Sequence, residues 1–214
     1  MSTITLYDQM YARILSHRRL PKIYVDFVDQ WLPMGSTLTV LEIGAADGWL
    51  TRHMKARTGK RVYGMDINPS ILDVLKVAGV TLVVGDAAKL PYRSGSMDRI
   101  VSVHTLEHIP DIGGAMKEMA RVLSKKGKML HIVPSPHVTK AEGALFGSLA
   151  RHGWNLVAAW REAHALHVHN FHDRKTMETL VRRAGLRITH AHRQFVLPEF
   201  GFSWVYEMEK SSKK

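Results

Sequence analysis

Short apolar runs rich in β-branched residues alternate with amphipathic segments through most of the chain. These runs predict strands, and they cover residues 39–44, 61–66, 80–86, 98–104, 128–133, 186–192 and 202–209. Strands that alternate with helices of ordinary length are typical of a mostly parallel, doubly wound sheet. We therefore expect an α/β fold that binds its ligands outside the carboxyl ends of the strands.

Apolar residues at helical spacing predict the helices that accompany these strands. The expected helical segments are 4–32, 48–57, 68–79, 111–127 and 173–185. Asp111 and Asp173 stand where N-caps are needed, because their side chains can accept hydrogen bonds from the first helical turn. Gly127 and Gly185 stand where such helices commonly end. The stretch 135–170 interrupts the alternation, so we expect it to form an insertion.

Length and composition predict one soluble domain over residues 1–214, because 45% of the 214 residues are apolar. There is no cysteine, which excludes disulfides and thiolate chemistry. The first residues lack a basic region followed by an apolar core, so no secretory signal is predicted. No apolar run reaches the length of a membrane span. The expected compartment is the cytoplasm.

The net charge of +11 permits a second interpretation of the surface. A basic surface attracts the phosphates of nucleic acids or anionic lipids. No arginine-rich arm, zinc finger or aromatic RNA-binding motif accompanies the charge. We therefore favour a generally basic, solvated surface over a nucleic-acid partner.

Glycine or aspartate follows each of the first three predicted strands. Gly44 and Gly48 allow a tight turn and a close approach of a ligand to the backbone. Asp66 can accept hydrogen bonds from both hydroxyls of a ribose. Asp86 can accept from the amino group of an adenine, and Ala87 leaves room for the ring. Each signal alone also fits a plain turn or a helix cap, but three in register favour a ligand with ribose and adenine.

Five segments in order resemble the motifs of class I S-adenosylmethionine-dependent methyltransferases. They are LEIGAADG, VYGMDINPS, GDAAKLPYRSGSMDRIVSVHTLEHIPD, RVLSKKGKMLHIVPS and HVHNFHDRKTMETLVRRAGL. The last is similar to the small-molecule branch that includes ubiquinone and menaquinone methyltransferases, also called type 11. The resemblance implies a Rossmann-like sheet of about seven strands, mostly parallel, with an antiparallel strand near the C-terminus and helices on both faces. It also implies S-adenosyl-L-methionine as cofactor. The resemblance says little about the substrate, and the acceptor that we expect is a small-molecule or lipid-like compound.

The resemblance implies that the cofactor lies against the ends of four strands. The residues concerned are Glu42, Gly44, Ala45, Ala46, Gly48, Asp66, Ile67, Asp86, Ala87 and His104. Gly44 and the neighbouring backbone would contact the methionine part, and Asp66 the ribose. Asp86 with Ala87 would contact the adenine. Glu42 would orient the loop or reach the amino group through water.

The chain departs from the motif at Ala46, which replaces its middle glycine. Alanine serves at this position if its φ angle is negative, and on that basis we expect cofactor binding to survive.

Methyl transfer from a sulfonium needs mainly alignment of the reactants, because the methyl group is already activated. A base is needed only if the acceptor must lose a proton, and His104 and His108 are the candidates. By resemblance, His104 also lines the methionine end of the cofactor. For His108 we favour a structural role in the turn after the fourth strand.

Residues outside the strand ends also permit two interpretations. His164, His167, His169 and His172 could bind a metal, but no cysteine or paired carboxylate completes a site, so no metal is expected. Aromatic residues at helical spacing are usually core, and those concerned are Tyr11, Trp49, Trp154 and Trp160. By resemblance, however, the N-terminal helices 4–32 and the insertion 135–170 would cover the acceptor, the insertion as a lid.

Three functions remain in competition. The favoured one is methyl transfer to a small or lipid-like acceptor. An RNA or protein methyltransferase is supported by the charge alone. A nicotinamide oxidoreductase shares the turn and the acidic residue, but it lacks the Gly-x-Gly-x-x-Gly spacing, and its Tyr-x-x-x-Lys pattern occurs only at Tyr206 and Lys210 on a predicted strand. A non-catalytic relative that only binds the cofactor or a partner also fits the sequence.

Overall fold

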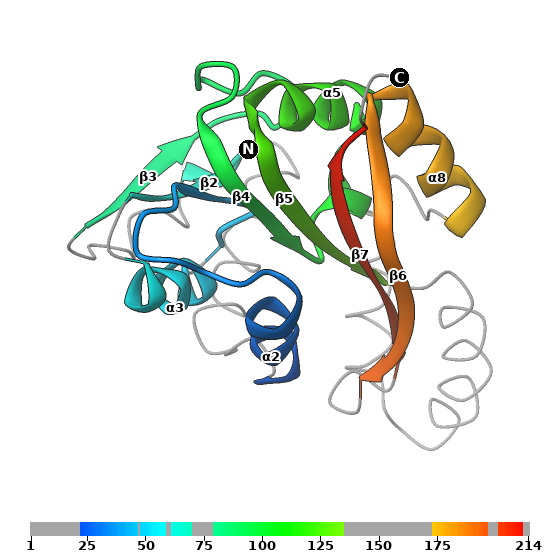
Figure 1. The fold of residues 1–214 in the computed structure, drawn as a ribbon, viewed down its shortest axis with the longest axis horizontal. Helices are drawn as coiled ribbons and strands as arrows, with labels where there is room; N and C mark the ends of the chain where they lie inside the picture. The colour runs from blue at the N-terminus through cyan, green and yellow to red at the C-terminus, as the bar shows by residue number, and fades with distance from the viewer. Residues whose placement is uncertain are drawn as a thin grey trace, which may run out of the picture.

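The fold is described from a computed structural model of the chain (Figure 1). The structure describes residues 22–46, 48–58, 61–69, 79–134, 173–196 and 201–211. Within these residues the elements follow one another as α2 (Lys22–Trp31), β1 (Val40–Ile43), α3 (Trp49–Arg57), β2 (Val62–Asp66), β3 (Val80–Val84), β4 (Met97–Val103), the 3-10 helix η1 (Leu106–His108), α5 (Ile112–Val122), β5 (Leu123–Pro134), α8 (Arg174–Arg183), β6 (Leu186–Val196) and β7 (Gly201–Lys210).

The strands form one sheet in the order β3-β2-β1-β4-β5-β7-β6. Strands β1 to β5 pair in parallel, whereas β7 runs antiparallel to both of its neighbours. The order reverses between β1 and β4, so the carboxyl ends of these two strands form the switch point where doubly wound sheets bind ligands. The expected α/β class, strand number and antiparallel strand near the C-terminus are confirmed.

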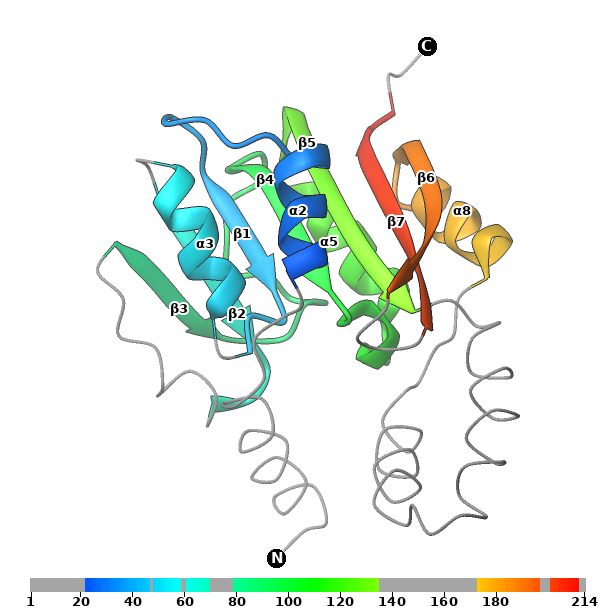
Figure 2. The same cartoon turned by 90° about the horizontal axis from the view of Figure 1, so that it is seen from below.

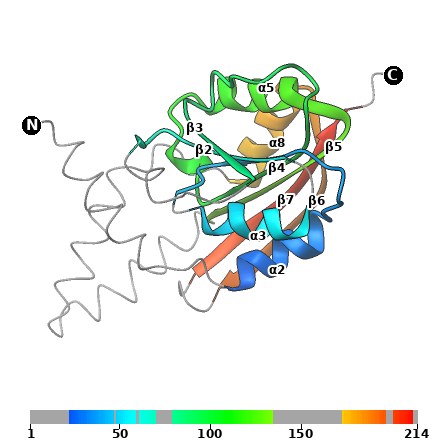
Figure 3. The ribbon, with the colours of Figure 1, turned by 90° about the vertical axis from the view of Figure 1, so that its left-hand side faces the viewer.

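Helices cover both faces of the sheet (Figures 2 and 3), with α2 and α3 on one face and α5 and α8 on the other. Alternate residues of each strand face opposite layers. Val40, Val101 and Leu130 join the core beneath α2 and α3. Leu41 and Ile100 join the core beneath α5 and α8. The sheet is therefore buried on both faces, as its near-continuous apolar strands require.

Capping follows the sequence at two helices. The Asp111 carboxylate accepts a hydrogen bond from Gly114 N at 2.8 Å, and that of Asp173 accepts one from Thr176 N at 2.8 Å. Gly185 follows α8 with a φ of 76°, the left-handed conformation that ends many helices. The expected positions of both caps and of this helix end are confirmed.

One helix end was expected at the wrong residue. α5 stops at Val122, and Gly127 lies inside β5 rather than ending the helix. Leu123 takes an extended conformation and pairs with Met97. The strand therefore begins five residues before the expected 128, because tertiary pairing overrides the local signal of the glycine.

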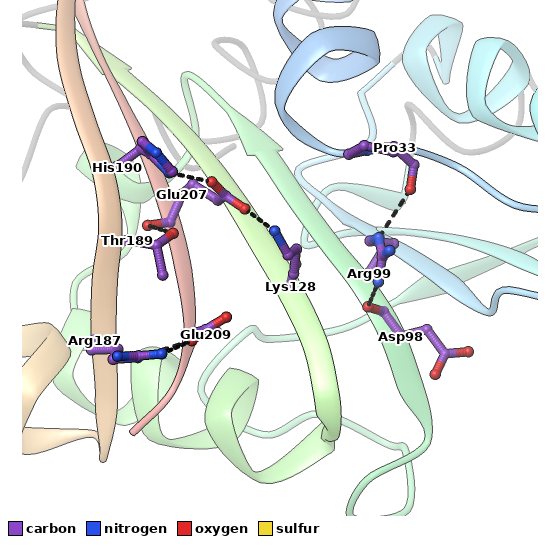
Figure 4. Close-up of polar contacts among 9 residues, drawn as sticks. All are labelled: Pro33, Asp98, Arg99, Lys128, Arg187, Thr189, His190, Glu207 and Glu209. Carbon is purple, nitrogen blue, oxygen red and sulfur yellow. Dashed lines mark hydrogen bonds and ion pairs between the residues drawn. The ribbon is translucent and has the colours of Figure 1, made fainter. Parts of the chain in front are cut away.

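Charged side chains join the last strands on the face shown in Figure 4. Glu207 of β7 is buried, and it accepts hydrogen bonds from Lys128 of β5 and from His190 of β6. Burial favours the neutral carboxyl, but these two partners hold the pKa of Glu207 below its usual range. The buried carboxylate of Glu207 thus links β7 to both of its antiparallel neighbours, β5 and β6.

Several sequence expectations lie outside the described residues. They concern Tyr11 and the rest of the first helix, the helix expected at 70–78, the lid at 135–170 and the histidines from 164 to 172. Among the described helices, none is long and apolar enough to cross a membrane.

Candidate active site

The turn after β1 has the tight geometry expected of its glycines. Gly44 has a φ of 76° and Gly48 one of 63°. A β-carbon on Gly44 would meet Thr105, at 2.5 Å from Cγ2 and 2.8 Å from Cβ. The loops after β1 and β4 are therefore in direct contact, and only glycine fits between them.

Ala46 differs from the sequence expectation. Its φ is 44°, not negative, so this alanine holds the left-handed conformation that the family's glycine would take freely. Its N–H donates to Asp66 Oδ2 at 2.9 Å, which fixes the strained residue against the next strand. The expectation of a negative φ is wrong because the turn imposes its conformation on whichever residue stands there.

Asp66 joins two loops at the end of β2. Oδ2 accepts from Ala46 N, and Oδ1 accepts from Asn68 N at 2.9 Å. The second bond is the cap-like role anticipated as an alternative for this residue. An ionised carboxylate offers about four acceptor positions, so these two bonds are compatible with a further role toward ribose hydroxyls.

Glu42 is buried, with 2% of the residue exposed. Its Oε2 accepts a hydrogen bond from the Thr51 hydroxyl in the first turn of α3. The glutamate thereby ties β1 to the helix that follows the glycine turn. Of the two roles expected for Glu42, this contact corresponds to orienting the loop.

The ends of β2 and β3 present an apolar and a charged side chain. Ile67 is 72% exposed, which is unusual for isoleucine and leaves an apolar surface next to Asp66. Asp86 is exposed, and its Oδ1 accepts from Ala88 N at 2.8 Å, as in a turn. Ala87 beside it is buried.

A charged pair on α5 braces the loop that carries Asp86 and Ala87. Arg121 donates to the carbonyls of Leu90 and Tyr92 at 2.9 and 2.8 Å, and Glu118 accepts from Leu90 N at 2.9 Å. The hydrogen bond from Arg121 lowers the pKa of Glu118. The ionised side chains of Glu118 and Arg121 thus hold this loop against α5 through hydrogen bonds.

His104 follows β4 in a strained conformation, with a φ of 50°. Its Nε2 lies 2.8 Å from the Tyr24 hydroxyl and 3.4 Å from Ser203 Oγ, and its Nδ1 lies 3.8 Å from Glu107 Oε1. The side chain is 23% exposed and therefore accessible. Non-glycine residues in such conformations cluster at functional sites, because the surrounding structure must hold them there.

His108 lies in η1, in the turn where a structural role was favoured. Its Nε2 is 3.8 Å from the same Glu107 oxygen that faces His104. Glu107 is 2% exposed, so two histidines flank one buried carboxylate. The described residues contain no group of three or more side chains arranged to hold a metal ion.

These strand-end loops, with the sheet order, are the features of one family, and a family comparison agrees. The model of the methyltransferase domain matches residues 14–191. The chain belongs to this methyltransferase family. Its curated and structural neighbours are S-adenosylmethionine-dependent methyltransferases, as the resemblance implied.

Two curated methyltransferases illustrate the range of relatives. Demethylmenaquinone methyltransferase from Tropheryma whipplei is 36% identical over 98 residues, which are 42% of this chain and 39% of that protein. Ubiquinone biosynthesis O-methyltransferase from Xanthomonas oryzae is 27% identical over 121 residues, 51% of this chain and 48% of that protein. The matched part spans less than half the length of these relatives.

Solved methyltransferases share the fold. Geranyl diphosphate C-methyltransferase from Streptomyces coelicolor, solved with S-adenosyl-L-homocysteine, superposes with a TM-score of 0.66. The sequences are 16% identical, and the match covers 90% of this chain and 78% of that one. At this identity the likeness concerns the fold alone.

The sequence interpretation missed the residues that support the methyltransferase site from behind. Thr105 lies against Gly44, and Thr51 donates a hydrogen bond to Glu42. Glu107 lies between the two histidines. Tyr24 lies in the segment 4–32 that was expected to be helical, but no sequence signal connected it to His104, 80 positions away. Only the signal at Glu107, a carboxylate between two histidines in HTLEH, was visible in the sequence.

Proposed function

We propose that this methyltransferase transfers the methyl group of S-adenosylmethionine to a small or lipid-like acceptor at the carboxyl ends of β1, β2, β3 and β4. The observation that carries the proposal is the interlocked turn: Gly44 against Thr105, and Ala46 against Asp66. This turn leads directly into α3, and a helix N-terminus attracts the carboxylate of an amino acid.

The side chains at these strand ends suit each part of this cofactor. The Asp66 carboxylate has the acceptor capacity for ribose hydroxyls, and the exposed Ile67 offers an apolar contact for a flat ring. Asp86, exposed at the end of β3, can accept from the adenine amino group while Ala87 keeps the approach clear. Glu42 acts through Thr51 by holding the turn in place.

The bound cofactor would supply an activated methyl group, so the chain's own task is alignment. Gly44 permits close approach, and Asp66 fixes the loop and the ribose together. His104, accessible at the end of β4, stands where an acceptor would meet the methionine end. Histidine is the side-chain type that exchanges protons near neutral pH, so His104 is a candidate base, as is its neighbour His108.

The acceptor class is inferred from relatives and from the sequence. Two relatives are named for demethylmenaquinone and ubiquinone biosynthesis, and a structural neighbour for geranyl diphosphate. These names describe small or prenylated molecules. The apolar composition of 135–170, outside the described residues, supports an enclosed acceptor more than an RNA. A single domain with this segment as a lid is part of the proposal.

A pair of aspartate variants tests the cofactor site. Asp66→Ala should weaken S-adenosylhomocysteine binding by about 1.5–3 kcal/mol, because hydrogen bonds to a charged group are lost. Asp98→Ala is the matched control: Asp98 also accepts a backbone N–H, from Thr39 at 2.9 Å, but at the opposite end of the sheet.

Both variants should lose comparable stability in thermal melts, whereas calorimetry should show weaker binding only for Asp66→Ala. Equal affinities in the two folded variants would restrict Asp66 to its structural bonds and remove the proposed ribose contact.

A further inference from the structure

Tyr24 reaches the methyltransferase site from α2, a helix that the motifs do not include. Its hydroxyl lies 2.8 Å from His104 Nε2, and the two rings meet edge to face at 5.0 Å between centroids. Tyr24 is fully buried, at 0% exposure, whereas His104 remains partly accessible. A buried phenol therefore holds one nitrogen of an accessible imidazole.

α2 is fixed along its length by aromatic contacts with histidines. Phe27 lies 5.8 Å from His192, and Trp31 lies 5.0 Å from His192 and 5.3 Å from His190, between ring centroids. Figure 2 shows the helix lying over the sheet with its first turn toward the carboxyl ends of the strands. Tyr24 thus belongs to a helix that is packed against the sheet, so its hydroxyl keeps a fixed position beside His104.

The groups around His104 differ at its two nitrogens. Nε2 faces the Tyr24 hydroxyl from α2 and Ser203 Oγ of β7, both uncharged. Nδ1 faces the buried Glu107 carboxylate of η1 at 3.8 Å, a distance too long for a hydrogen bond. The next residue, His108, also faces this carboxylate, with its Nε2 3.8 Å from Glu107 Oε1. A tyrosine hydroxyl can accept a hydrogen bond from Nε2–H, and in a neutral histidine that bond leaves Nδ1 without the proton.

We propose that Tyr24 is a positioning residue for methyl transfer. Its hydroxyl oxygen accepts a hydrogen bond from Nε2–H of His104, so that Nδ1 is the basic nitrogen toward the hydroxyl or amine that receives the methyl group. This inference rests on the proposed function and narrows its acceptor class. Nδ1 can change its protonation state without breaking the bond to Tyr24. Glu107 is the acidic side chain that faces Nδ1, at 3.8 Å, and an ionised carboxylate at that distance stabilises an imidazolium.

The proton and electron balance of the step is simple. The acceptor's O–H or N–H bond breaks, and its proton moves to His104 Nδ1. The electron pair on the acceptor atom forms the new bond to the methyl carbon. The carbon–sulfur bond breaks, and its electron pair stays on sulfur. An acceptor that is already ionised, such as a carboxylate, would not need this arrangement.

Histidine NMR tests the arrangement without any acceptor. In protein labelled with ¹⁵N-histidine, His104 should be neutral at high pH with its proton on Nε2, its signals being assigned from the His104→Asn spectrum. Tyr24→Phe removes only the hydroxyl, and the proton should move toward Nδ1, facing Glu107. Tyr206→Phe is the control, because the buried Tyr206 hydroxyl of β7 makes no hydrogen bond to the described residues.

Kinetics test the consequence. Methyl transfer from tritiated S-adenosylmethionine is measured on a panel of phenols, alcohols, amines and carboxylates. For the acceptor that reacts, Tyr24→Phe should lower kcat about 10- to 100-fold, less than the loss of the base itself. The acid limb of the kcat profile should shift to lower pH. S-adenosylhomocysteine affinity should not change, and Tyr206→Phe should behave as wild type.

The outcomes separate this inference from the proposed function. If wild-type protein fails to bind S-adenosylhomocysteine, the proposed function fails. If it binds, but His104 carries its proton on Nδ1 in wild type or Tyr24→Phe leaves the tautomer and the pH profile unchanged, Tyr24 has no positioning role. Transfer only to carboxylates would likewise overturn the assigned acceptor class.

Discussion

Replacing Gly44 with alanine tests how tightly the methyltransferase turn is built. Two costs arise at this position. The residue has a φ of 76°, so a side chain there costs about 1–2 kcal/mol of backbone strain. The new β-carbon would also lie 2.5 Å from Thr105 Cγ2, an overlap that costs about 1–3 kcal/mol as neighbours shift. The expected loss of folding free energy is therefore about 2–5 kcal/mol.

Gly95 provides a matched control that isolates the overlap. Its φ is 71°, but a β-carbon there would meet nothing within 4 Å. Gly95→Ala should therefore cost only the strain, about 1–2 kcal/mol. In a chain of this size each kcal/mol lowers Tm by about 2–4 °C, so the two variants are resolved by thermal melts followed by circular dichroism.

A double variant tests whether Thr105 is the obstacle. Thr105→Ala removes Oγ1 and Cγ2, so it should recover part of the loss caused by Gly44→Ala, and a double-mutant cycle should show coupling between the two sites. Gly44→Ala should also weaken S-adenosylhomocysteine binding. The reasoning is refuted if Gly44→Ala costs no more than Gly95→Ala, or if the cycle shows no coupling.

Two further predictions concern regions away from the turn. Burial lowers the pKa of His131 from 6.5 to about 3, with the Ser102 hydroxyl 2.7 Å from Nδ1. Because the folded pKa is depressed, the stability from neutral His131 is present above pH 6.5 and lost as pH falls toward 3. About 2 kcal/mol should go between pH 6.5 and 5. Urea unfolding at several pH values should show this loss, and the double variant Ser102→Ala/His131→Leu should lack it. Deleting the centre of 135–170 should spare S-adenosylhomocysteine binding and abolish methyl transfer, and a deletion variant that methylates at the normal rate would refute the proposed lid.

The sequence predicted the architecture well because hydrophobic periodicity and capping are local signals. Asp111 and Asp173 cap the helices as expected, since a cap needs only a residue type and the next turn of chain. Gly127 shows the limit of this logic. A glycine after a periodic run fits a helix end, but pairing of Leu123 with Met97 extends the strand instead.

The sequence predicted the position of site residues that depend on one loop, and it missed contacts between distant elements. The roles of these residues toward a cofactor stay predictions. Asp66 and Asp86 were placed at the ends of strands because the end of an apolar run is a local signal. The sign of φ at Ala46 was wrong, since it is imposed by the turn and by Asp66. The contact between Tyr24 and His104 joins elements 80 positions apart, and no spacing rule connects them.

Buried polar groups within the sheet also escaped the sequence interpretation. Ser102 and His131 read as ordinary strand positions, yet they are opposite partners on β4 and β5 and both are fully buried. Which residues of neighbouring strands meet is decided by register across the sheet, and register comes from the whole fold rather than from either segment.

The central claim is that the turn after β1 binds S-adenosylmethionine. Isothermal titration calorimetry of the purified chain with S-adenosylmethionine, S-adenosylhomocysteine and NAD tests it most directly. The expected result is saturable binding of the first two with one site per chain, weakened by Asp66→Ala, and no binding of NAD. Preferential binding of NAD, or no binding of either sulfur compound by the folded protein, would contradict the claim.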